Sequence, residues 1–358
     1  MTNFLQLHVL TTYSASNLNR DDTGRPKTLS FGGAERLRVS SQSLKRALRT
    51  SDLFASAVGG AMGTRSNTFT DSLVQALRTR GLPDDEIVKR VSVVITKDKL
   101  GAPKKEKPTS TEQLVHLGPE ELQRLDALAD RLMANEVLAD KEALVLVQKP
   151  RAADIALFGR MLADNPGFNV EAAAQVAHAF TTHRVSVEDD FYTAVDDLKS
   201  ANREADRGAG FIGVAEYGAG VFYTYIAVDA DQLVRNLPND KDLAADAIAG
   251  FVEAALTVSP KGKQNSYASR AYASYALAEL GTRAPRTLAG AFVKPVGVNG
   301  ENDFLAASIQ RLGDLRKNLD KIYGACVSKH AHLDADAATG SLDEIKALAR
   351  EAVHAVKL

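Results

Sequence analysis

The chain has 358 residues, 45% of them hydrophobic and 25% charged, and its net charge is −1. This composition is ordinary for a globular protein, and the length allows one large domain or two smaller ones. No apolar run reaches membrane-spanning length, no signal peptide is evident, and the single cysteine, Cys326, excludes an internal disulfide, so we expect a cytoplasmic protein that does not bind a membrane.

The first elements are predicted to be a strand, a loop, and a strand that leads directly into a helix. Phe4–Leu10 is apolar with alternating polar positions, and Tyr13–Gly33 is rich in turn-forming residues. Alternation returns in RLRVS at 36–40, with the two arginines on one face. The apolar residues Leu44 and Leu48 then follow at helical spacing. A strand therefore passes into a helix near Ser40, which is a suitable N-cap.

This strand–helix junction carries an excess of positive charge. Between Arg20 and Arg49 there are eight cations and three acids, a net charge of +5 in a chain that is otherwise acidic. Lys45 and Arg49 are four residues apart and share one helix face. A solvated charged face is the ordinary explanation, but the interleaved Ser and Gln residues favour a polyanion-binding surface.

The middle of the chain, from about residue 51 to residue 150, is predicted to be a mostly helical insertion. Helical spacing occurs over Asp71–Arg80, Asp84–Val94 and Pro119–Asn135, and Lys141–Val147 is predicted to form a further short helix. A charged, proline-bearing loop separates the second of these helices from the third.

The later elements mix strands and helices, which favours an α+β fold over a doubly wound parallel sheet. Val221–Val228 is the clearest strand in the chain, and Arg184–Lys199 alternates in part around the adjacent aromatics Phe191 and Tyr192. The Ala-rich segment Val170–Phe180 is predicted to be a helix. A strand is expected at Thr287–Val298, and helices are expected at Leu243–Leu256, Asp303–Leu319 and Asp343–Val356.

Several patterns in the sequence resemble sites of chemistry. Gly208–Gly213 matches G-x-G-x-x-G, but polar residues precede it where a dinucleotide site needs a strand, so a connector is favoured. The segment His330–Asp336 has no zinc spacing and is expected to be a solvated loop. The acids around Asp189 and Asp190 lack a spacing specific for a metal. No metal or cofactor site is therefore predicted.

Three apolar residues remain open to two interpretations from the residues alone. Phe191 and Tyr192 stand in an acidic, polar setting, where they could stack on bases or wedge between them, although one of two adjacent aromatics on a strand usually belongs to the core. Met161 could likewise be a wedge or a core residue, and the residues alone favour the core.

Several long motifs, in order, closely resemble the CasC-type backbone subunit of the type I-E CRISPR surveillance complex, Cascade, of the RAMP superfamily. They are NFLQLHVL near the start, FGGAERLRVSSQSLKRALR, DIALFGRM, HAFTTHRVSVEDDFYTAVDDL and GAGVFYTY. The resemblance is strong over Asn3–Thr50 and Asp154–Tyr225 and weaker in the helical insertion and after about Ser269.

The resemblance implies a fold shaped like a right hand, with an RRM-like (ferredoxin-like) palm, helical fingers and a β-hairpin thumb. The palm is expected at 1–50, 151–183 and 218–358, the fingers at 51–150 and the thumb at 184–217. Such a subunit is non-catalytic. It polymerises along CRISPR RNA, holds the RNA backbone, and kinks the RNA periodically so that the intervening bases can pair with target DNA.

The expected partners are the CRISPR RNA, target DNA, further copies of the chain, and the large, small and guide-end-capping subunits of Cascade. A recruited helicase–nuclease would cut the target. The alternative is a metal-dependent ribonuclease of the same superfamily. The resemblance places RNA contacts on ten residues: Arg20, Lys27, Ser40, Gln42, Lys45, Arg49, Met161, Phe191, Tyr192 and Lys261.

Overall fold

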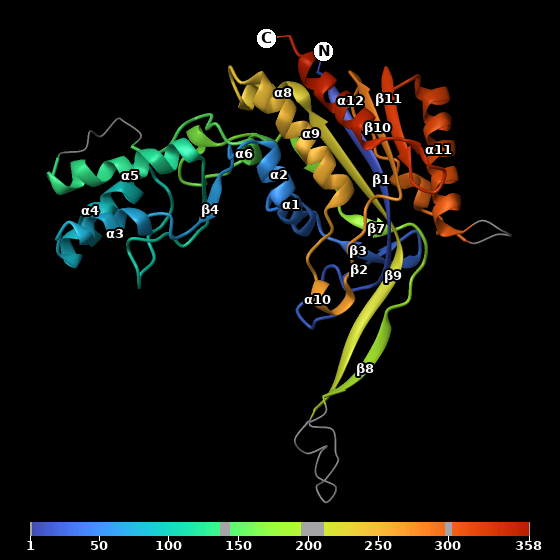
Figure 1. The fold of residues 1–358 in the computed structure, drawn as a ribbon, viewed down its shortest axis with the longest axis horizontal. Coiled ribbons are helices and arrows are strands. Elements are labelled where there is room, and N and C mark those ends of the chain that lie inside the picture. The colour runs from blue at the N-terminus through green and yellow to red at the C-terminus, as the bar shows by residue number, and fades with distance from the viewer. Residues whose placement is uncertain (1, 137–143, 195–210, 298–302, 358) are drawn as a thin grey trace, which may run out of the picture.

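The structure is a computed structural model, and it describes residues 2–136, 144–194, 211–297 and 303–357. A ten-stranded antiparallel sheet organises the chain in the order β12-β11-β10-β1-β9-β7-β3-β2, with β6 and β8 also pairing with β9 (Figure 1). Its strands are β1 (Phe4–Ser16), β2 (Thr28–Phe31), β3 (Ala34–Val39), β6 (Ala174–Val176), β7 (Ala179–Thr181), β8 (Glu188–Ala194), β9 (Phe211–Asp229), β10 (Tyr275–Gly281), β11 (Lys329–Asp334) and β12 (Thr339–Gly340).

Helices cover both faces of this sheet, which confirms the α+β prediction. One face packs against α9 and α12 through Leu5 and Leu7 of β1, and the opposite face packs against α11 through Leu10 of the same strand. Burying both faces in this way produces two apolar layers around one sheet. The helices of this part are α1 (Ser41–Arg49), α2 (Asp52–Ala57), α6 (Ala153–Phe158), α8 (Ala230–Asn236), α9 (Lys241–Thr257), α10 (Gln264–Tyr267), α11 (Phe304–Tyr323) and α12 (Leu342–His354).

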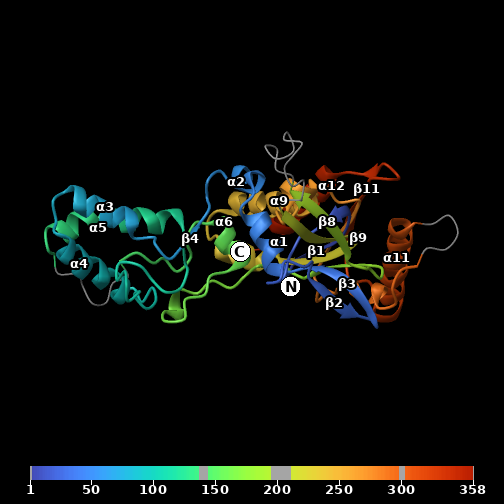
Figure 2. The same cartoon turned by 90° about the horizontal axis from the view of Figure 1, so that it is seen from below.

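The helical insertion forms a separate body beside the sheet (Figures 1 and 2). Its elements are β4 (Thr64–Ser66), α3 (Asp71–Thr79), α4 (Asp84–Lys97), β5 (Val115–Leu117) and α5 (Pro119–Met133). They enclose their own apolar core, which includes Leu73, Ile95 and Leu125. The helices predicted from the sequence at α3, α4 and α5 are therefore confirmed.

A two-stranded ribbon extends away from the sheet, formed by β8 and the first half of β9 (Figure 1). Every side chain of β8 is exposed. The second half of β9 runs through the centre of the sheet, where Val221 and Tyr223 are buried. One long strand thus connects the exposed ribbon to the core.

Three predictions of secondary structure are wrong. Val170–Phe180 contains β6 and most of β7 instead of a helix, because backbone pairing with β9 outweighs the helical preference of its alanines. Thr287–Val298 holds only a short 3-10 turn, Ala289–Phe292, in its described part. The loop predicted over Tyr13–Gly33 contains the end of β1 and all of β2, which pairs with β3 through a turn at Gly32 and Gly33.

Two local environments also differ from expectation. Arg36 is fully buried, because its face of β3 is covered: its guanidinium donates to the carbonyls of Thr181 (2.8 Å) and Phe292 (2.9 Å). It therefore does not contribute to the cationic surface. The expected loop at His330–Asp336 contains β11, which pairs with β10.

Two further predictions fall partly outside the described residues. The helix predicted at Lys141–Val147 includes residues 141–143, which are not described, and its described part, Leu144–Val147, is not helical. The backbone N–H groups of Leu144, Val145 and Leu146 instead donate to the buried carboxylate of Asp98. The connector predicted at Gly208–Gly213 includes residues 208–210, which are also not described. No helix in the described part of the chain is both long and apolar enough to cross a bilayer.

Candidate nucleic-acid interface

Helix α1 presents polar side chains to two hollows while its apolar face packs on the core. The Ser40 hydroxyl accepts a hydrogen bond from the Ser43 N–H (3.2 Å) and so caps the helix as predicted. Ala47 and Leu48 are buried, which fixes the rotation of the helix. The opposite face must then carry Gln42, Lys45, Arg46 and Arg49. Its first turn contains no acidic residue.

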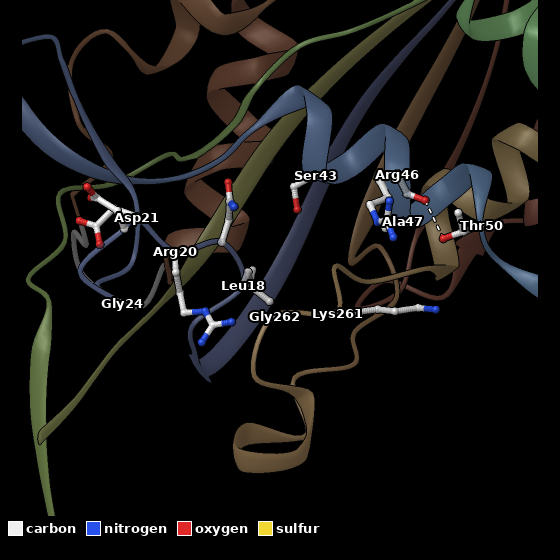
Figure 3. Close-up of a pocket in the computed structure, with 12 residues that line it drawn as sticks. Leu18, Arg20, Asp21, Gly24, Ser43, Arg46, Ala47, Thr50, Lys261 and Gly262 are labelled. Atoms are coloured by element: carbon white, nitrogen blue, oxygen red, sulfur yellow. Dashed lines mark hydrogen bonds between the residues drawn. The ribbon is translucent and has the colours of Figure 1, made fainter. Parts of the chain in front are cut away.

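The first hollow, here called the Arg20 groove, has a volume of about 490 Å³. Three segments of the chain meet there, and each brings one cation, namely Arg20, Arg46 or Lys261 (Figure 3). The groove is lined by Leu18, Asn19, Arg20, Asp21, Asp22, Gly24, Ser43, Arg46, Ala47, Thr50, Lys261 and Gly262.

One of the two acids of the Arg20 groove, Asp21, forms hydrogen bonds within its own loop. Asp21 accepts hydrogen bonds from the Thr23 hydroxyl and from the N–H groups of Thr23 and Arg25. These bonds, the Thr23 hydroxyl first among them, lower the pKa of Asp21. The loop is thereby held in the shape that presents Arg20.

Gly262 allows the Lys261 loop to approach the segment that carries Arg20. A Cβ atom at this position would lie 2.3 Å from the carbonyl oxygen of Leu18 and 2.6 Å from that of Asn17. Both are backbone atoms, so a side chain cannot be accommodated unless the loops separate. The glycine therefore determines how closely Lys261 and Arg20 stand.

The second hollow, here called the Met161 groove, lies on another side of α1 and has a volume of about 620 Å³. It combines cations with apolar side chains, a pairing that suits a phosphate next to a base. Met161 is 81% exposed and Leu114 is 52% exposed. The lining residues are Gln42, Lys45, Arg46, Arg49, Arg65, Leu114, His116, Phe158, Gly159 and Met161.

A buried carboxylate positions Arg49 in the Met161 groove. Asp154 Oδ2 accepts from Arg49 Nη1 (3.2 Å) and from His116 Nε2 (2.9 Å), and Oδ1 accepts from the Gly63 N–H (2.7 Å). Burial would raise the pKa of Asp154, but these groups, His116 foremost, outweigh it and hold the pKa below its ordinary value. The ionised carboxylate thus ties the insertion to helix α1.

Met161 is held out of the core by its two predecessors. Gly159 has φ +79°, and a Cβ there would lie 2.8 Å from the Val170 carbonyl oxygen. Arg160 is buried, and its guanidinium binds both carboxylate oxygens of Glu121 at 2.7 and 2.8 Å. Because this turn is anchored on both sides, the exposure of Met161 is a fixed property of the fold, and the core assignment favoured by the residues alone is wrong.

Phe191 and Tyr192 lie on the exposed ribbon, 74% and 47% exposed. Because neighbouring strand residues point to opposite faces, the two rings lie on different faces of the ribbon. Phe191 pairs with Val214, and the adjacent position on that face is Ile212; both are exposed apolar residues. The core assignment is wrong for both aromatics, and Ile212 and Val214 extend the apolar face.

Besides Phe191 and Tyr192 on the ribbon, two of the predicted contacts line neither groove. Ser40 is buried, and its hydroxyl is engaged in capping α1. Lys27 lies near the start of α1, where its N–H donates to the Asn19 carbonyl (2.8 Å). The grooves therefore bring together six of the ten predicted residues: Arg20, Gln42, Lys45, Arg49, Met161 and Lys261.

The residues that line the grooves but were not predicted as contacts include Arg46, Arg65, Leu114 and His116. Arg46 had a signal, because it neighbours Lys45 in the cationic helix. No pattern in the sequence indicated Arg65 or His116, because these residues are about fifty positions apart and are brought together by the pairing of β4 with β5.

Comparisons with known proteins place the chain in a family. A model of the CT1975-like protein family matches residues 5–357, and the chain belongs to this family. It is similar to a chain of "CRISPR RNA-guided surveillance complex, pre-nicking", with 30% identity, a TM-score of 0.82, and coverage of 98% of this chain and 100% of that one. It is also similar to a chain of "CRISPR RNA-guided surveillance complex", with 27% identity, a TM-score of 0.61, and coverage of 98% and 99%. No curated protein matched significantly.

Proposed function

We propose that the chain is a CasC-type backbone subunit of a type I-E CRISPR surveillance complex, and that several copies lie side by side along one CRISPR RNA. The observation that carries this proposal is the pair of cation-lined grooves on α1, in a chain whose structural relatives belong to CRISPR RNA-guided complexes. In the hand-like division of this RAMP-superfamily subunit, 1–50, 151–183 and 218–358 form the RRM-like palm, 51–150 the fingers and 184–217 the thumb, although α2, at the start of 51–150, packs on the core of the sheet.

The grooves are suited to the sugar-phosphate backbone of RNA. Lys45, Arg46 and Arg49 supply charge and N–H donors, and Gln42 adds an uncharged donor and acceptor on the same helix. Contacts of this kind to phosphates give affinity without a choice of sequence. A guide-binding subunit needs this property, because its guides differ and base pairing reads the target.

The exposed apolar side chains are suited to kinking the guide. Met161 stands at the edge of one groove, and Phe191 and Tyr192 stand on the ribbon that extends from the sheet. We propose that the ribbon of one copy reaches the groove of its neighbour, where these side chains part the stacked bases. The bases between successive kinks remain free to pair with target DNA.

In this proposal the subunit performs no chemistry and works in the cytoplasm with the large, small and guide-end-capping subunits of Cascade. A recruited helicase–nuclease cuts the target.

The alternative, a metal-dependent ribonuclease, relies on the acids of the ribbon. Asp189 and Asp190 are adjacent on β8 and so point to opposite faces, which does not favour a shared metal. Regularly spaced cuts in complementary RNA with Mg²⁺, lost in Asp189→Asn or Asp190→Asn, would establish the alternative.

The test of RNA binding is the double variant Lys45→Ala/Arg49→Ala. It should weaken binding to RNAs of unrelated sequence equally and reduce the salt slope by about 1.4, since each lost phosphate contact accounts for about 0.7 with single strands. The matched control is Lys317→Ala/Lys321→Ala, two exposed lysines at the same spacing on α11. An unchanged salt slope in the first variant, or an equal loss in the control, would contradict the groove assignment.

A further inference from the structure

A cluster of basic side chains outside both grooves lies beside the start of helix α1. It consists of Lys27, ahead of β2, Arg38 of β3, and His178, between β6 and β7. His178 is exposed and the other two are half-buried. Within the described part of the chain, neither Lys27 nor Arg38 forms an ion pair with a carboxylate. The cluster therefore presents two cations that no carboxylate in the described part of the chain neutralises.

Hydrogen bonding determines which protons the cluster presents. Arg38 Nη1 lies 3.0 Å from His178 Nδ1. A guanidinium has only N–H donors, so Nδ1 must be the acceptor, and the neutral ring carries its proton on Nε2. Arg38 therefore keeps further N–H groups for a ligand, and His178 adds one donor of its own.

The cluster is joined to the Arg20 groove through the backbone. The N–H of Arg38 donates to the Lys27 carbonyl, and the N–H of Lys27 donates to the Asn19 carbonyl, both at 2.8 Å. Asn19 lines the Arg20 groove, and its Oδ1 atom accepts from the Ser40 N–H at the beginning of α1. A polyanion in that groove would pass close to the cluster.

We propose that Arg38 and His178 join Lys27, which the family resemblance already implies as an RNA contact, in holding one phosphodiester group of a bound nucleic acid, and that His178 takes up a proton when the phosphate binds. This inference rests on the proposed function, because it adds a contact to the same RNA path. In the complex the imidazolium donates to a phosphate oxygen, and Arg38, no longer held by Nδ1, donates to the phosphate as well.

The charges that face His178 give the direction of the pH dependence. They are Arg38 from β3 and Lys27 from the segment before β2, and its own segment, Ala177–Ala179, contributes no other titratable group. Partial burial first, and then these two cations, lower the pKa of His178 in the free protein. A phosphate would neutralise the cations and raise this pKa, so RNA should bind more tightly as the pH falls from about 8 to about 6.

The test measures binding of labelled single-stranded RNA of mixed sequence to the full chain at these two pH values. His178→Asn is the informative variant, because its amide oxygen can still accept from Arg38 but the side chain cannot be protonated. His330→Asn, an exposed histidine on β11, is the matched control. Arg38→Ala tests the charge separately. Melting curves by circular dichroism establish that each variant is folded.

The wild type and His330→Asn should bind several-fold more tightly at the lower pH, up to about tenfold for each unit by which the pKa rises. His178→Asn should lose this gain, and Arg38→Ala should reduce the salt slope by about 0.7. If His178→Asn keeps the full pH dependence, or Arg38→Ala keeps the wild-type slope, the phosphate site is refuted although RNA binding stands. If the wild-type chain binds no RNA, the proposed function itself fails.

Discussion

Replacing Asp154 by Asn should destabilise the protein and loosen the Met161 groove together. The carboxylate is fully buried and accepts four hydrogen bonds, from Arg49 Nη1 (3.2 Å), His116 Nε2 (2.9 Å), Gly63 N (2.7 Å) and Ile155 N (3.0 Å). An amide can keep the two backbone donors on its oxygen. Its NH₂ group then faces Arg49, which has only donors to offer.

The loss of stability in Asp154→Asn depends on which other hydrogen bonds Arg49 and His116 can form. Breaking a buried ion pair typically costs about 3–5 kcal/mol, because a charge is left buried and unpaired. The Arg49 side chain is 18% exposed at the groove, so it can reach water, and His116 can change tautomer to accept from the amide. We therefore expect a loss of about 2–3 kcal/mol in the free energy of unfolding at neutral pH.

Urea unfolding monitored by circular dichroism measures this loss, with Asp314→Asn, an exposed carboxylate on α11, as the control. The pKa of Asp154 is lowered in the folded state, so its contribution is complete above the ordinary value of 3.8 and is lost as the pH falls through the folded value. The gap between wild type and Asp154→Asn should narrow as the pH falls below 3.8. A loss below about 0.5 kcal/mol at neutral pH, or a gap independent of pH, would refute the reasoning.

Three further changes test other parts of the account. Met161→Ala should leave the midpoint of urea unfolding unchanged, since the side chain is 81% exposed, but it should weaken RNA binding by about 1–2 kcal/mol in an anisotropy titration. A lower urea midpoint with unchanged RNA binding would instead make Met161 a packing residue. Gly262→Ala should cost about 1–3 kcal/mol in urea and also weaken RNA binding, because its Cβ would displace the Leu18 backbone; full stability and affinity would contradict the close approach. Glu279 is bound by His8, Arg286 and Arg316, which overcome burial and lower its pKa to about 2, so its stabilisation is complete above about pH 4.5 and is lost towards pH 2. Glu279→Gln should flatten the fall of the urea midpoint over that range, and an unaltered fall would assign the acid sensitivity to other carboxylates.

The local features of the site could be predicted because they follow from sequence periodicity. The change of period near Ser40 indicated both β3 and α1, and the spacing of Lys45 and Arg49 placed them on one face. Burial was harder to predict, because it depends on what covers each face. Arg36 and Arg38 alternate identically in the sequence, yet only Arg36 is covered by the segment around Phe292.

The remaining features depend on contacts between distant segments. The Ala-rich composition of Val170–Phe180 favoured a helix, but the backbone of this segment pairs with β9 as β6 and β7, and this long-range pairing outweighs the local preference. Arg65 and His116 are placed by the β4–β5 pairing, and Asp154 by three different segments. The resemblance supplied Met161 and Phe191, whose exposure the apolar side chains themselves argued against.

Native mass spectrometry of the chain mixed with unrelated single-stranded RNAs of increasing length tests the central claim most directly. If the chain is a backbone subunit that holds RNA through its phosphates, the number of bound copies should rise in proportion to RNA length, independently of sequence, and the RNA should remain intact. One copy per RNA at every length, binding to one sequence only, or shortened RNA would contradict the account.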